Sequence, residues 1–362
     1  MIIRLDANNA ADYLRSAGQI GPSESIHAHE LSGGVSNSVF YVSRSIGNDF
    51  VLKQGRERLN VAEPWFCSME RIWREVDVLR ICERLTRSHQ FSSPLRVETP
   101  RLLFEDRDNY LYAMTSAPQD HVVWKSELLS GRARTDVAES CGALLGHLHS
   151  RTWHDDDLAQ RLDDRQFFDG LRLDPYYRQV ARVHADLRPA MERLIDSVWV
   201  ERHCLVHGDY SPKNLLVYGD CLMLIDFEVG HYGDPAFDLG FFLSHLMLKA
   251  FHHAPLEQPY FRLVDSFWQR YLAVMSEAIP AREIDQLMRR AIVNFAGCAL
   301  ARLDGKSKVD YLDQGDRRQQ MRRLCRALFA EPPAHWEDVS ELAAKSLSDR
   351  LGPIRISVKG SD

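Results

Sequence analysis

Short apolar runs separated by turn residues fill much of the first 115 residues and predict β-strands. A helix capped by Asp6 is expected over Asp6–Ser16, and a longer one over Ser68–Arg84, where apolar residues recur at helical spacing. The predicted strands are His27–Leu31, Ser38–Val42, Phe50–Lys53, Arg101–Glu105 and Tyr110–Met114. This order, helix, three strands, helix, two strands, indicates a small α+β lobe over residues 1–115.

Beyond a polar connection at Thr115–Gln119, the pattern becomes mainly helical. Asp136 and Glu139 have the spacing of a capping box, and an apolar helical face follows them. A buried helix is expected around Phe237–Phe251. Three short apolar runs interrupt the helices and predict strands at Cys204–Val206, Leu215–Val217 and Leu222–Ile225. We therefore predict a larger, mainly helical lobe over residues 116–362.

Length and composition narrow the class of protein. The chain has 362 residues, of which 45% are hydrophobic and 27% charged, so two compact lobes are expected rather than a disordered chain. The net charge is −6 and no long basic run occurs, which argues against a nucleic-acid partner. The apolar stretch Phe237–Phe251 is too short to span a membrane and contains Asp238, His245 and Lys249. We expect no membrane partner.

Cysteine usage indicates a reducing compartment. The seven cysteines are an odd number, widely spaced and without a CxxC pair, which argues against a disulfide framework or a zinc site. Arg4 and Asp6 stand where a signal peptide needs an apolar run. We therefore predict a cytoplasmic protein.

One polar loop carries the strongest chemical signal. The sequence from Val206 to Val217 reads VHGDYSPKNLLV, so Asp209 is followed five residues later by Asn214. Twelve residues further on, Asp226 and Glu228 follow an apolar strand in the sequence LIDFE. Transfer of a phosphoryl group requires a base for the attacking hydroxyl and oxygen ligands for magnesium. These carboxylates and this amide have the spacing to meet both needs.

The pattern HGDxxxxN followed by DxE resembles the aminoglycoside phosphotransferase and choline kinase group, with some likeness to methylthioribose kinases over residues 30–250. The resemblance implies a two-lobed, protein-kinase-like fold, ATP and Mg²⁺ as cofactors, and transfer of the γ-phosphoryl group to a small-molecule hydroxyl. It implies that Asp209 is the catalytic base and that Asn214 and Asp226 bind magnesium, with Glu228 assisting the second metal ion or touching the substrate.

The resemblance also assigns residues of the N-terminal lobe to the nucleotide. Lys53 is expected to bind the ATP phosphates and to pair with a helix glutamate, for which Glu75 is favoured over Glu70. The loop between the first two strands resembles a phosphate-covering loop, and residues 114–118 would form the hinge beside adenine. The further expected nucleotide-binding residues are Gly33, Gly34, Ser36, Asn37, Met114 and Ser116.

The acceptor is the least defined part of the prediction. A sugar, a thiosugar, an amino alcohol or an aminoglycoside is expected, and its pocket would contain Trp65, Arg172, Tyr176, His231 and Asp234. An aromatic wall with an arginine suits a sugar or an acceptor that bears a carboxylate. Two other functions stay open: a non-catalytic module that binds Mg-ATP, and a protein kinase, against which Gly208 and Glu228 argue. The sequence does not decide between ATP and GTP, and it does not give the oligomeric state.

Overall fold

The computed structural model describes residues 2–31, 37–57, 67–88, 92–312 and 315–348. The chain divides by its internal contacts into two compact units, which are described separately below. The first unit comprises Met1–Gln90, Glu98–His121 and Met223–Val229, and the second comprises Phe91–Val97, Val122–Leu222 and Gly230–Asp362. The boundary after residue 115 that the sequence suggested for the lobes stays a prediction.

An antiparallel sheet forms the centre of the first unit. Its strands are β1 Ile26–Glu30, β2 Asn37–Arg44, β3 Phe50–Gly55, β5 Leu102–Asp106 and β6 Leu111–Thr115. Their order is β1-β2-β3-β6-β5, with Leu52 of β3 opposite Ala113 of β6. All five strands overlap the runs predicted from the sequence, and each begins or ends within two residues of its predicted bound.

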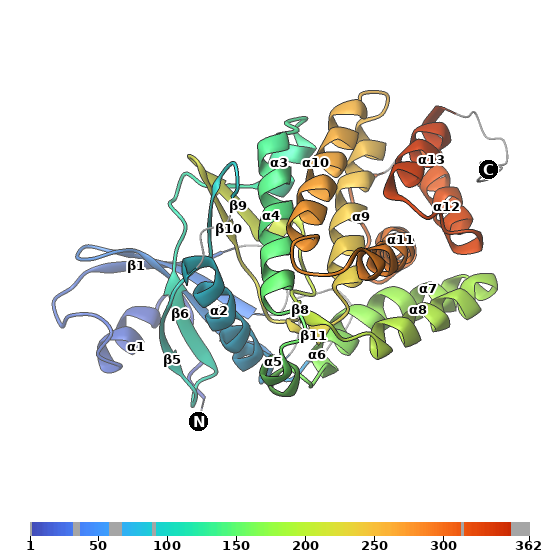
Figure 1. Ribbon diagram of the computed structural model, residues 1–362. Coiled ribbons are helices and arrows are strands. Elements are labelled where there is room, and N and C mark those ends of the chain that lie inside the picture. The colour runs from blue at the N-terminus through green and yellow to red at the C-terminus, as the bar shows by residue number, and fades with distance from the viewer. Residues whose placement is uncertain (1, 32–36, 58–66, 89–91, 313–314, 349–362) are drawn as a thin grey trace. The chain divides into compact units, whose positions relative to one another are not determined.

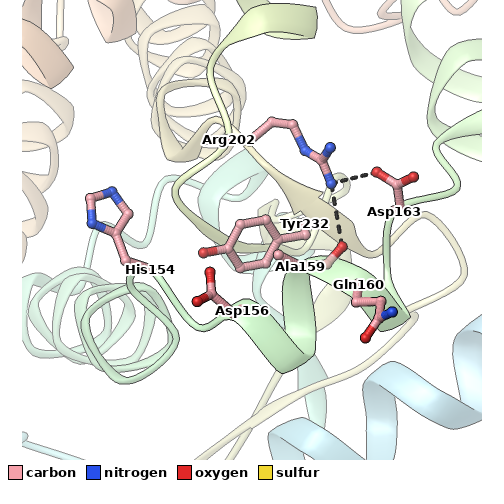
Figure 2. A pocket seen from close by; sticks show the side chains of 7 residues that line it. All are labelled: His154, Asp156, Ala159, Gln160, Asp163, Arg202 and Tyr232. Atoms are coloured by element: carbon pink, nitrogen blue, oxygen red, sulfur yellow. Dashed lines mark hydrogen bonds and ion pairs between the residues drawn. The ribbon is translucent and has the colours of Figure 1, made fainter.

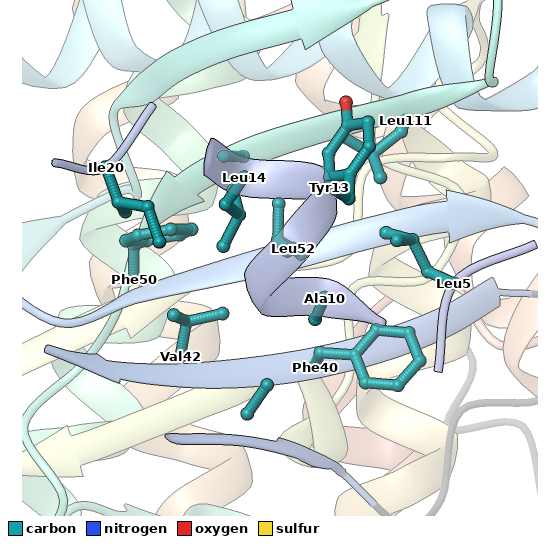
Figure 3. Packing of buried hydrophobic residues seen from close by; sticks show 12 residues of the cluster. Leu5, Ala10, Tyr13, Leu14, Ile20, Phe40, Val42, Phe50, Leu52 and Leu111 are labelled. Carbon is teal, nitrogen blue, oxygen red and sulfur yellow. The ribbon is translucent and has the colours of Figure 1, made fainter. Parts of the chain in front are cut away.

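Helix α1, Ala10–Ser16, covers one face of this sheet (Figure 3). Successive residues of a strand point to opposite faces, so Phe50 and Leu52 face the helix, whereas Val51 and Lys53 face away from it. The core under α1 consists of Leu5, Ala10, Tyr13, Leu14, Ile20, Ala28, Phe40, Val42, Phe50, Leu52, Leu111 and Ala113. Helix α2, Arg71–Ser88, contacts β3 and β5 and contributes the ion-pair partner of Lys53 described below.

The predicted start of α1 is wrong. The N-cap position of the helix is occupied by Asn9 rather than by Asp6, whose Oδ1 accepts hydrogen bonds from the backbone N–H groups of Asn8 at 2.7 Å and Asn9 at 2.9 Å. These bonds close a turn before the helix, which begins only at Ala10. A short aspartate side chain stabilises such a turn as readily as a helix N-terminus, and the sequence alone does not separate the two.

Helices form most of the second unit (Figure 1). The longer ones are α4 Thr135–Arg151, α8 Arg188–Val200, α9 Pro235–His253, α10 Gln258–Met275, α11 Ala281–Asp304, α12 Gly315–Ala330 and α13 Trp336–Ser348. The shorter ones are α3 Trp124–Leu129, α5 Asp156–Arg161, α6 Gln166–Phe168, α7 Gln179–Val183, the 3₁₀ turns Ala185–Leu187 and Pro212–Asn214, and a π-helical segment Asp169–Arg178. The capping box expected at Asp136 and Glu139 is wrong, because Asp136 bonds to Arg134 and to the backbone of Val137 within the first turn.

Short strands lie between these helices and carry the loops of interest. They are β4 Arg96–Glu98, β7 Val122–Val123, β8 Cys204–Val206, β9 Leu215–Tyr218, β10 Cys221–Leu224 and β11 His231–Gly233. The sheet order is β4-β10-β9-β7, and β11 pairs antiparallel with β8. The three strands predicted in this region correspond to β8, β9 and β10.

Two glycines let neighbouring helices of the second unit approach closely. A Cβ atom on Gly142 of α4 would lie 2.3 Å from the carbonyl oxygen of Phe267 on α10. A Cβ atom on Gly240 of α9 would lie 2.4 Å from the backbone nitrogen of Phe295 on α11. Because the atoms met are backbone atoms, the helices themselves would have to move apart. Figure 1 shows α4 and α10 running side by side.

We therefore expect Gly240→Ala to lower the free energy of unfolding by ~1–3 kcal/mol, as over-packing does elsewhere. Gly170→Ala is the matched control, since a Cβ atom there meets no atom within 4 Å. Alanine is a better helix former than glycine, so the control is expected to be neutral or slightly stabilising. Urea denaturation of both variants measures the difference, and equal stabilities would contradict the close approach of α9 and α11.

Candidate active site

The loop after β8 is held by one buried carboxylate. Asp238 of α9 accepts the backbone N–H of His207 at 2.7 Å and that of Gly208 at 2.8 Å. Gly208 has φ of 75°, a left-handed conformation that glycine adopts without a Cβ clash. The ring of His149 on α4 lies 3.4 Å from Asp238 Oδ2 and bonds through its other nitrogen to the hydroxyl of Tyr271 at 2.9 Å. Helices α4, α9 and α10 thus fix the position of Asp209.

Hydrogen bonds and nearby charges also set the ionisation of Asp238. Burial alone would raise the pKa of this carboxyl, but the bond from His149, the charge of that ring and the bond from the His207 N–H hold the pKa below its ordinary value. A lowered carboxyl pKa stabilises the folded state above the ordinary pKa, and this contribution is lost as pH falls through the lowered value.

Asp209 is surrounded by cations and one amide. Its side chain is almost fully buried, and Oδ1 lies 2.8 Å from Arg172 Nη2. Oδ2 lies 2.7 Å from Lys213 Nζ and accepts a hydrogen bond of 2.9 Å from Asn214 Nδ2. The same Nδ2 donates to the backbone carbonyl of Asp209, which fixes the two ends of the loop relative to each other. Arg172 also donates to the Gly208 carbonyl at 2.7 Å.

A second cluster of charges lies within the first unit. Lys53 Nζ lies 2.6 Å from Glu75 Oε1 and 3.0 Å from Asp226 Oδ1. Of the two glutamates considered from the sequence, Glu75 therefore meets Lys53, whereas Glu70 accepts a bond from the Tyr110 hydroxyl. Asp226 has φ of 72°, a left-handed conformation that is uncommon outside glycine and is often found at functional sites.

Burial and charge act in opposite directions on this pair. Burial alone would lower the pKa of Lys53, but the Glu75 carboxylate and further anionic groups raise it well above its ordinary value. Burial raises the pKa of Glu75, against the attraction of Lys53, and the charges of Asp226 and Glu228 add to that rise. The lysine therefore stays charged among a surplus of carboxylates, which is an environment that attracts a further cation.

Glu228 is held by side chains on two other elements of the same unit. Its Oε2 lies 3.3 Å from Arg71 Nε and accepts a bond of 3.2 Å from Asn37 Nδ2. Arg71 is fully buried at the start of α2, one helical turn before Glu75. The i and i+4 spacing of Arg71 and Glu75 places both on one helix face. Of the two carboxylates of the DFE sequence, Asp226 is the more exposed, at 23% against 9% for Glu228.

The other residues expected to contact the nucleotide are partly described. Met114 is buried in β6, opposite Val51, and the Ser116 hydroxyl donates to the backbone carbonyl of Asp49 at 3.2 Å. Gly33, Gly34 and Ser36 lie outside the described residues, and so does Trp65, which is expected in the acceptor pocket rather than at the nucleotide. The roles of all these residues stay predictions.

Residues expected to line the acceptor pocket occupy different surroundings in the second unit. Arg172 contacts Asp209, as described above. The Tyr176 ring packs against Phe241, while the His231 ring packs on Phe168. Asp234 caps α9 by accepting a hydrogen bond from the backbone N–H of Ala236. It also forms an ion pair of 2.9 Å with Arg290.

Sequence reasoning missed several residues that contact the predicted ones. Lys213, His149 and Arg71 were given no chemical role, although they touch Asp209, Asp238 and Glu228 respectively. Only Lys213 had a local signal, because it lies four residues after Asp209 in the same loop. His149 is distant in sequence from its partner, so no spacing rule identifies it.

A surface pocket of about 430 Å³ lies elsewhere in the second unit (Figure 2). It is lined by His154, Asp156, Ala159, Gln160, Asp163, Arg202 and Tyr232. Arg202 is neutralised there by Asp163 at 2.5 Å and donates to the Ala159 carbonyl, as Figure 2 shows. None of the residues predicted for phosphoryl transfer lines this pocket, and we assign it no chemistry.

Replacing Asp238 tests whether it positions the loop. We expect Asp238→Asn to lower turnover and to cost ~1–3 kcal/mol of stability, because one backbone N–H loses its acceptor in a buried site. Mg-ATP affinity should change little, since the nucleotide contacts predicted in the first unit remain. Asp338→Asn, an exposed carboxylate in the first turn of α13, is the control. Turnover that equals that of the unchanged protein would contradict the positioning role.

Comparisons with known proteins agree with this geometry. The chain matches the model of the phosphotransferase enzyme family over residues 27–273. Methylthioribose kinase of Yersinia pseudotuberculosis serotype O:3 (strain YPIII) is 25% identical over 398 residues, which cover 94% of this chain and 95% of that protein. Methylthioribose kinase of Exiguobacterium sibiricum is 23% identical over 334 residues, covering 81% and 83% of the two chains.

A solved structure supports the fold. Choline kinase from Cryptosporidium parvum Iowa II superposes with a TM-score of 0.50 at 12% identity and covers 95% of this chain and 94% of its own, a likeness of fold alone. The predicted α+β, protein-kinase-like fold is confirmed. The family model spans more than half of the chain, and its relatives over nearly the full length are small-molecule kinases. The chain therefore belongs to the phosphotransferase enzyme family and is a small-molecule kinase.

Proposed function

We propose that this kinase transfers the γ-phosphoryl group of ATP to a hydroxyl of a sugar-like small molecule, with Asp209 as the base. The arrangement of one buried carboxylate between Arg172, Lys213 and Asn214 carries this proposal. Thiosugars come first among the acceptors to be tested, because the relatives matched over most of the chain are methylthioribose kinases. Sugars, amino alcohols and aminoglycosides remain alternatives.

The first unit is proposed to bind the nucleotide. Lys53 would bind the phosphates while Glu75 holds its ammonium group in place. Asn37 would border the phosphates together with Gly33, Gly34 and Ser36. The backbone around Met114 and Ser116 would contact the adenine.

Magnesium fits the chemistry of the oxygen donors present. Among the described residues no three His, Cys, Asp or Glu side chains group into a metal site, but magnesium in kinases needs only one or two carboxylates besides water and phosphate. We propose that Asp226 and the amide oxygen of Asn214 bind it, assisted by Glu228. Both hydrogen bonds of the Asn214 amide use Nδ2 rather than Oδ1. When bound, the ion offsets negative charge on the phosphates.

Asp209 is proposed to orient the acceptor hydroxyl and to accept its proton as the oxygen attacks phosphorus. Arg172 and Lys213 limit the directions in which the carboxylate can turn, since each holds one of its oxygens. Lys213 is half exposed and supplies a positive charge beside the reacting group. A positioned base of this kind contributes ~10²–10⁴ to the rate.

Two rival functions are less favoured. A non-catalytic nucleotide-binding module would not need the ion pairs that fix Asp209, and it would not need Lys53, Asp209, Asn214 and Asp226 to be present together. A protein kinase carries arginine at the position of Gly208, where φ is 75° and a side chain would be strained. We further propose that the enzyme acts in the cytoplasm, because its seven cysteines are all free thiols. No nucleic-acid or membrane partner is proposed.

We expect Asp209→Ala to lower turnover by ~10²–10⁴ while Mg-ATP binding is retained, since the base is lost and the nucleotide contacts are not. Coupled assay of ADP release gives the rate, and calorimetric titration gives the affinity. Asp220→Ala, at the exposed turn between β9 and β10, serves as the control. If Asp209→Ala phosphorylates an identified acceptor as fast as the unchanged protein does, the assignment of the base is wrong.

The acceptor class is tested by a screen of ADP release over thiosugars, sugars, amino alcohols and aminoglycosides. We expect acceptor-dependent release with at least one polyhydroxylated sugar-like compound and none with mixed protein substrates. Mass spectrometry of the product identifies a phosphate ester. Release that no acceptor stimulates, despite tight Mg-ATP binding, would favour the non-catalytic module.

A further inference from the structure

A histidine, a lysine and an arginine lie close together in the second unit, and none of them has a carboxylate partner among the described residues. Lys249 of α9 is fully buried, and its Nζ donates to the backbone carbonyl of His245 at 3.0 Å. It also lies 5.3 Å from the ring centroid of Tyr311. Among the described residues no aspartate or glutamate forms an ion pair with Lys249 or with Arg302. We refer to His245, Lys249 and Arg302 as the basic cluster.

The cluster also contains polar atoms without a hydrogen-bond partner. His245 is 7% exposed, and its Nε2 has no partner among the described residues. The hydroxyl of Tyr311 and Nε of Arg302 are buried and unpartnered in the same way. A buried polar group without a partner costs roughly 1–3 kcal/mol, so several of them together indicate that a ligand completes the site.

The charges that act on the cluster are of one sign. Burial lowers the pKa of Lys249 well below its ordinary value, and the charges of Lys125 and Arg302 lower it further. Burial also lowers the pKa of His245 well below its ordinary value, and the charges of Arg302 and Lys249 lower it further. The nearby carboxylates offer no compensation, because Asp304 is engaged by Arg322 and Asp310 is exposed.

The cluster is connected to the catalytic loop through aromatic rings. The guanidinium of Arg172, which binds Asp209, lies 5.7 Å from the centroid of Phe241, and the Phe241 ring packs on His245 at 4.9 Å. Arg302 donates to the hydroxyl of Tyr176, whose ring also contacts Phe241. All of these residues belong to the second unit, the one that contains Asp209.

We propose that His245, Lys249 and Arg302, with the hydroxyl of Tyr311, bind an anionic group on the acceptor: a carboxylate or a phosphate ester. The aromatic contacts that lead from the cluster through Phe241 to Arg172 point to the acceptor as the ligand, and in this respect the inference rests on the proposed function. A ligand anion supplies the missing counter-charge for Lys249 and acceptors for the unpartnered donors. The kinase therefore prefers an anionic, polyhydroxylated acceptor to a neutral one.

Binding of simple anions tests the cluster without any acceptor. Thermal unfolding is followed at saturating Mg-ADP, with inorganic phosphate or malonate added as the phosphate and carboxylate probes. We expect at least one probe to raise the melting temperature of the unchanged protein and of Lys308→Met, an exposed lysine in the segment between Arg302 and Tyr311. Lys249→Met should unfold at a higher temperature than the unchanged protein when no anion is present, yet gain nothing from the probe.

Acceptor kinetics test the link to phosphoryl transfer. Ribose, ribonate, ribose 5-phosphate and methylthioribose are compared, so that the acceptors differ mainly in the anionic group. We expect one of the anionic compounds to be preferred over ribose by about 10-fold or more in kcat/KM. Lys249→Met and Tyr311→Phe should reduce this preference by raising KM for the anionic acceptor. The Tyr311→Phe variant retains the aromatic ring, so it still tests the site if Lys249→Met folds poorly.

The outcomes separate this inference from the proposed function. Equal stabilisation of Lys249→Met and the unchanged protein by the anions overturns the inference. The inference is also overturned if methylthioribose or ribose is the best acceptor and neither variant changes the kinetics with that acceptor. In that case the kinase assignment stands. Anion stabilisation that depends on Lys249, with no acceptor phosphorylated, supports the anion site and contradicts the proposed function.

Discussion

The arrangement of the loop that carries Asp209 depends on the two hydrogen bonds that Asp238 accepts from backbone N–H groups. Gly208 adopts a left-handed conformation at this point, and the carboxylate stabilises that bend directly. The cost of burying the Asp238 carboxylate is offset by its hydrogen bond with His149. The ring of His149 is held in turn by the hydroxyl of Tyr271 on a different helix. The close approach of the helices at Gly142 and Gly240 brings these side chains together. The position of Asp209, the proposed base, therefore depends on packing across the second unit.

The first unit contains a buried ion pair, between Lys53 and Glu75, rather than a single buried carboxylate. Lys53 and Glu75 are both buried, and the desolvation of two charges is compensated only when their geometry and further hydrogen bonds are favourable. Asp226 and Glu228 add negative charge to this cluster, and Arg71 offsets part of it. Such a cluster is a poor means of stabilising a fold, but it is suited to holding Lys53 in a fixed position, as the proposed binding of phosphates by this lysine would require.

Sequence reasoning predicted what is local and missed what is assembled from distant segments. The strands around Lys53 and the helix that carries Glu75 follow from period-two and helical patterns, and the loop from Asp209 to Asn214 follows from one motif. Arg172 was expected in the acceptor pocket, but its contact with Asp209 was not predicted, and His149 was given no role; both residues lie on other helical segments than Asp209, and Arg172 lies in a π-helical one that contains a proline. The predicted helix start at Asp6 was wrong for the opposite reason. One short side chain stabilises a turn and a helix N-terminus equally well.

The same distinction explains why the reaction is easier to assign than the acceptor. Phosphoryl transfer requires a few groups at fixed spacing, and these lie within two short stretches of chain. The recognition of the acceptor that we propose instead draws on Arg172, on His245 and Lys249 of α9, and on Arg302 of α11. No motif links these positions, and a chain can keep the catalytic loop while changing every one of them. A buried lysine without a carboxylate partner among the described residues is thus informative, because phosphoryl transfer does not require it and an anionic ligand would.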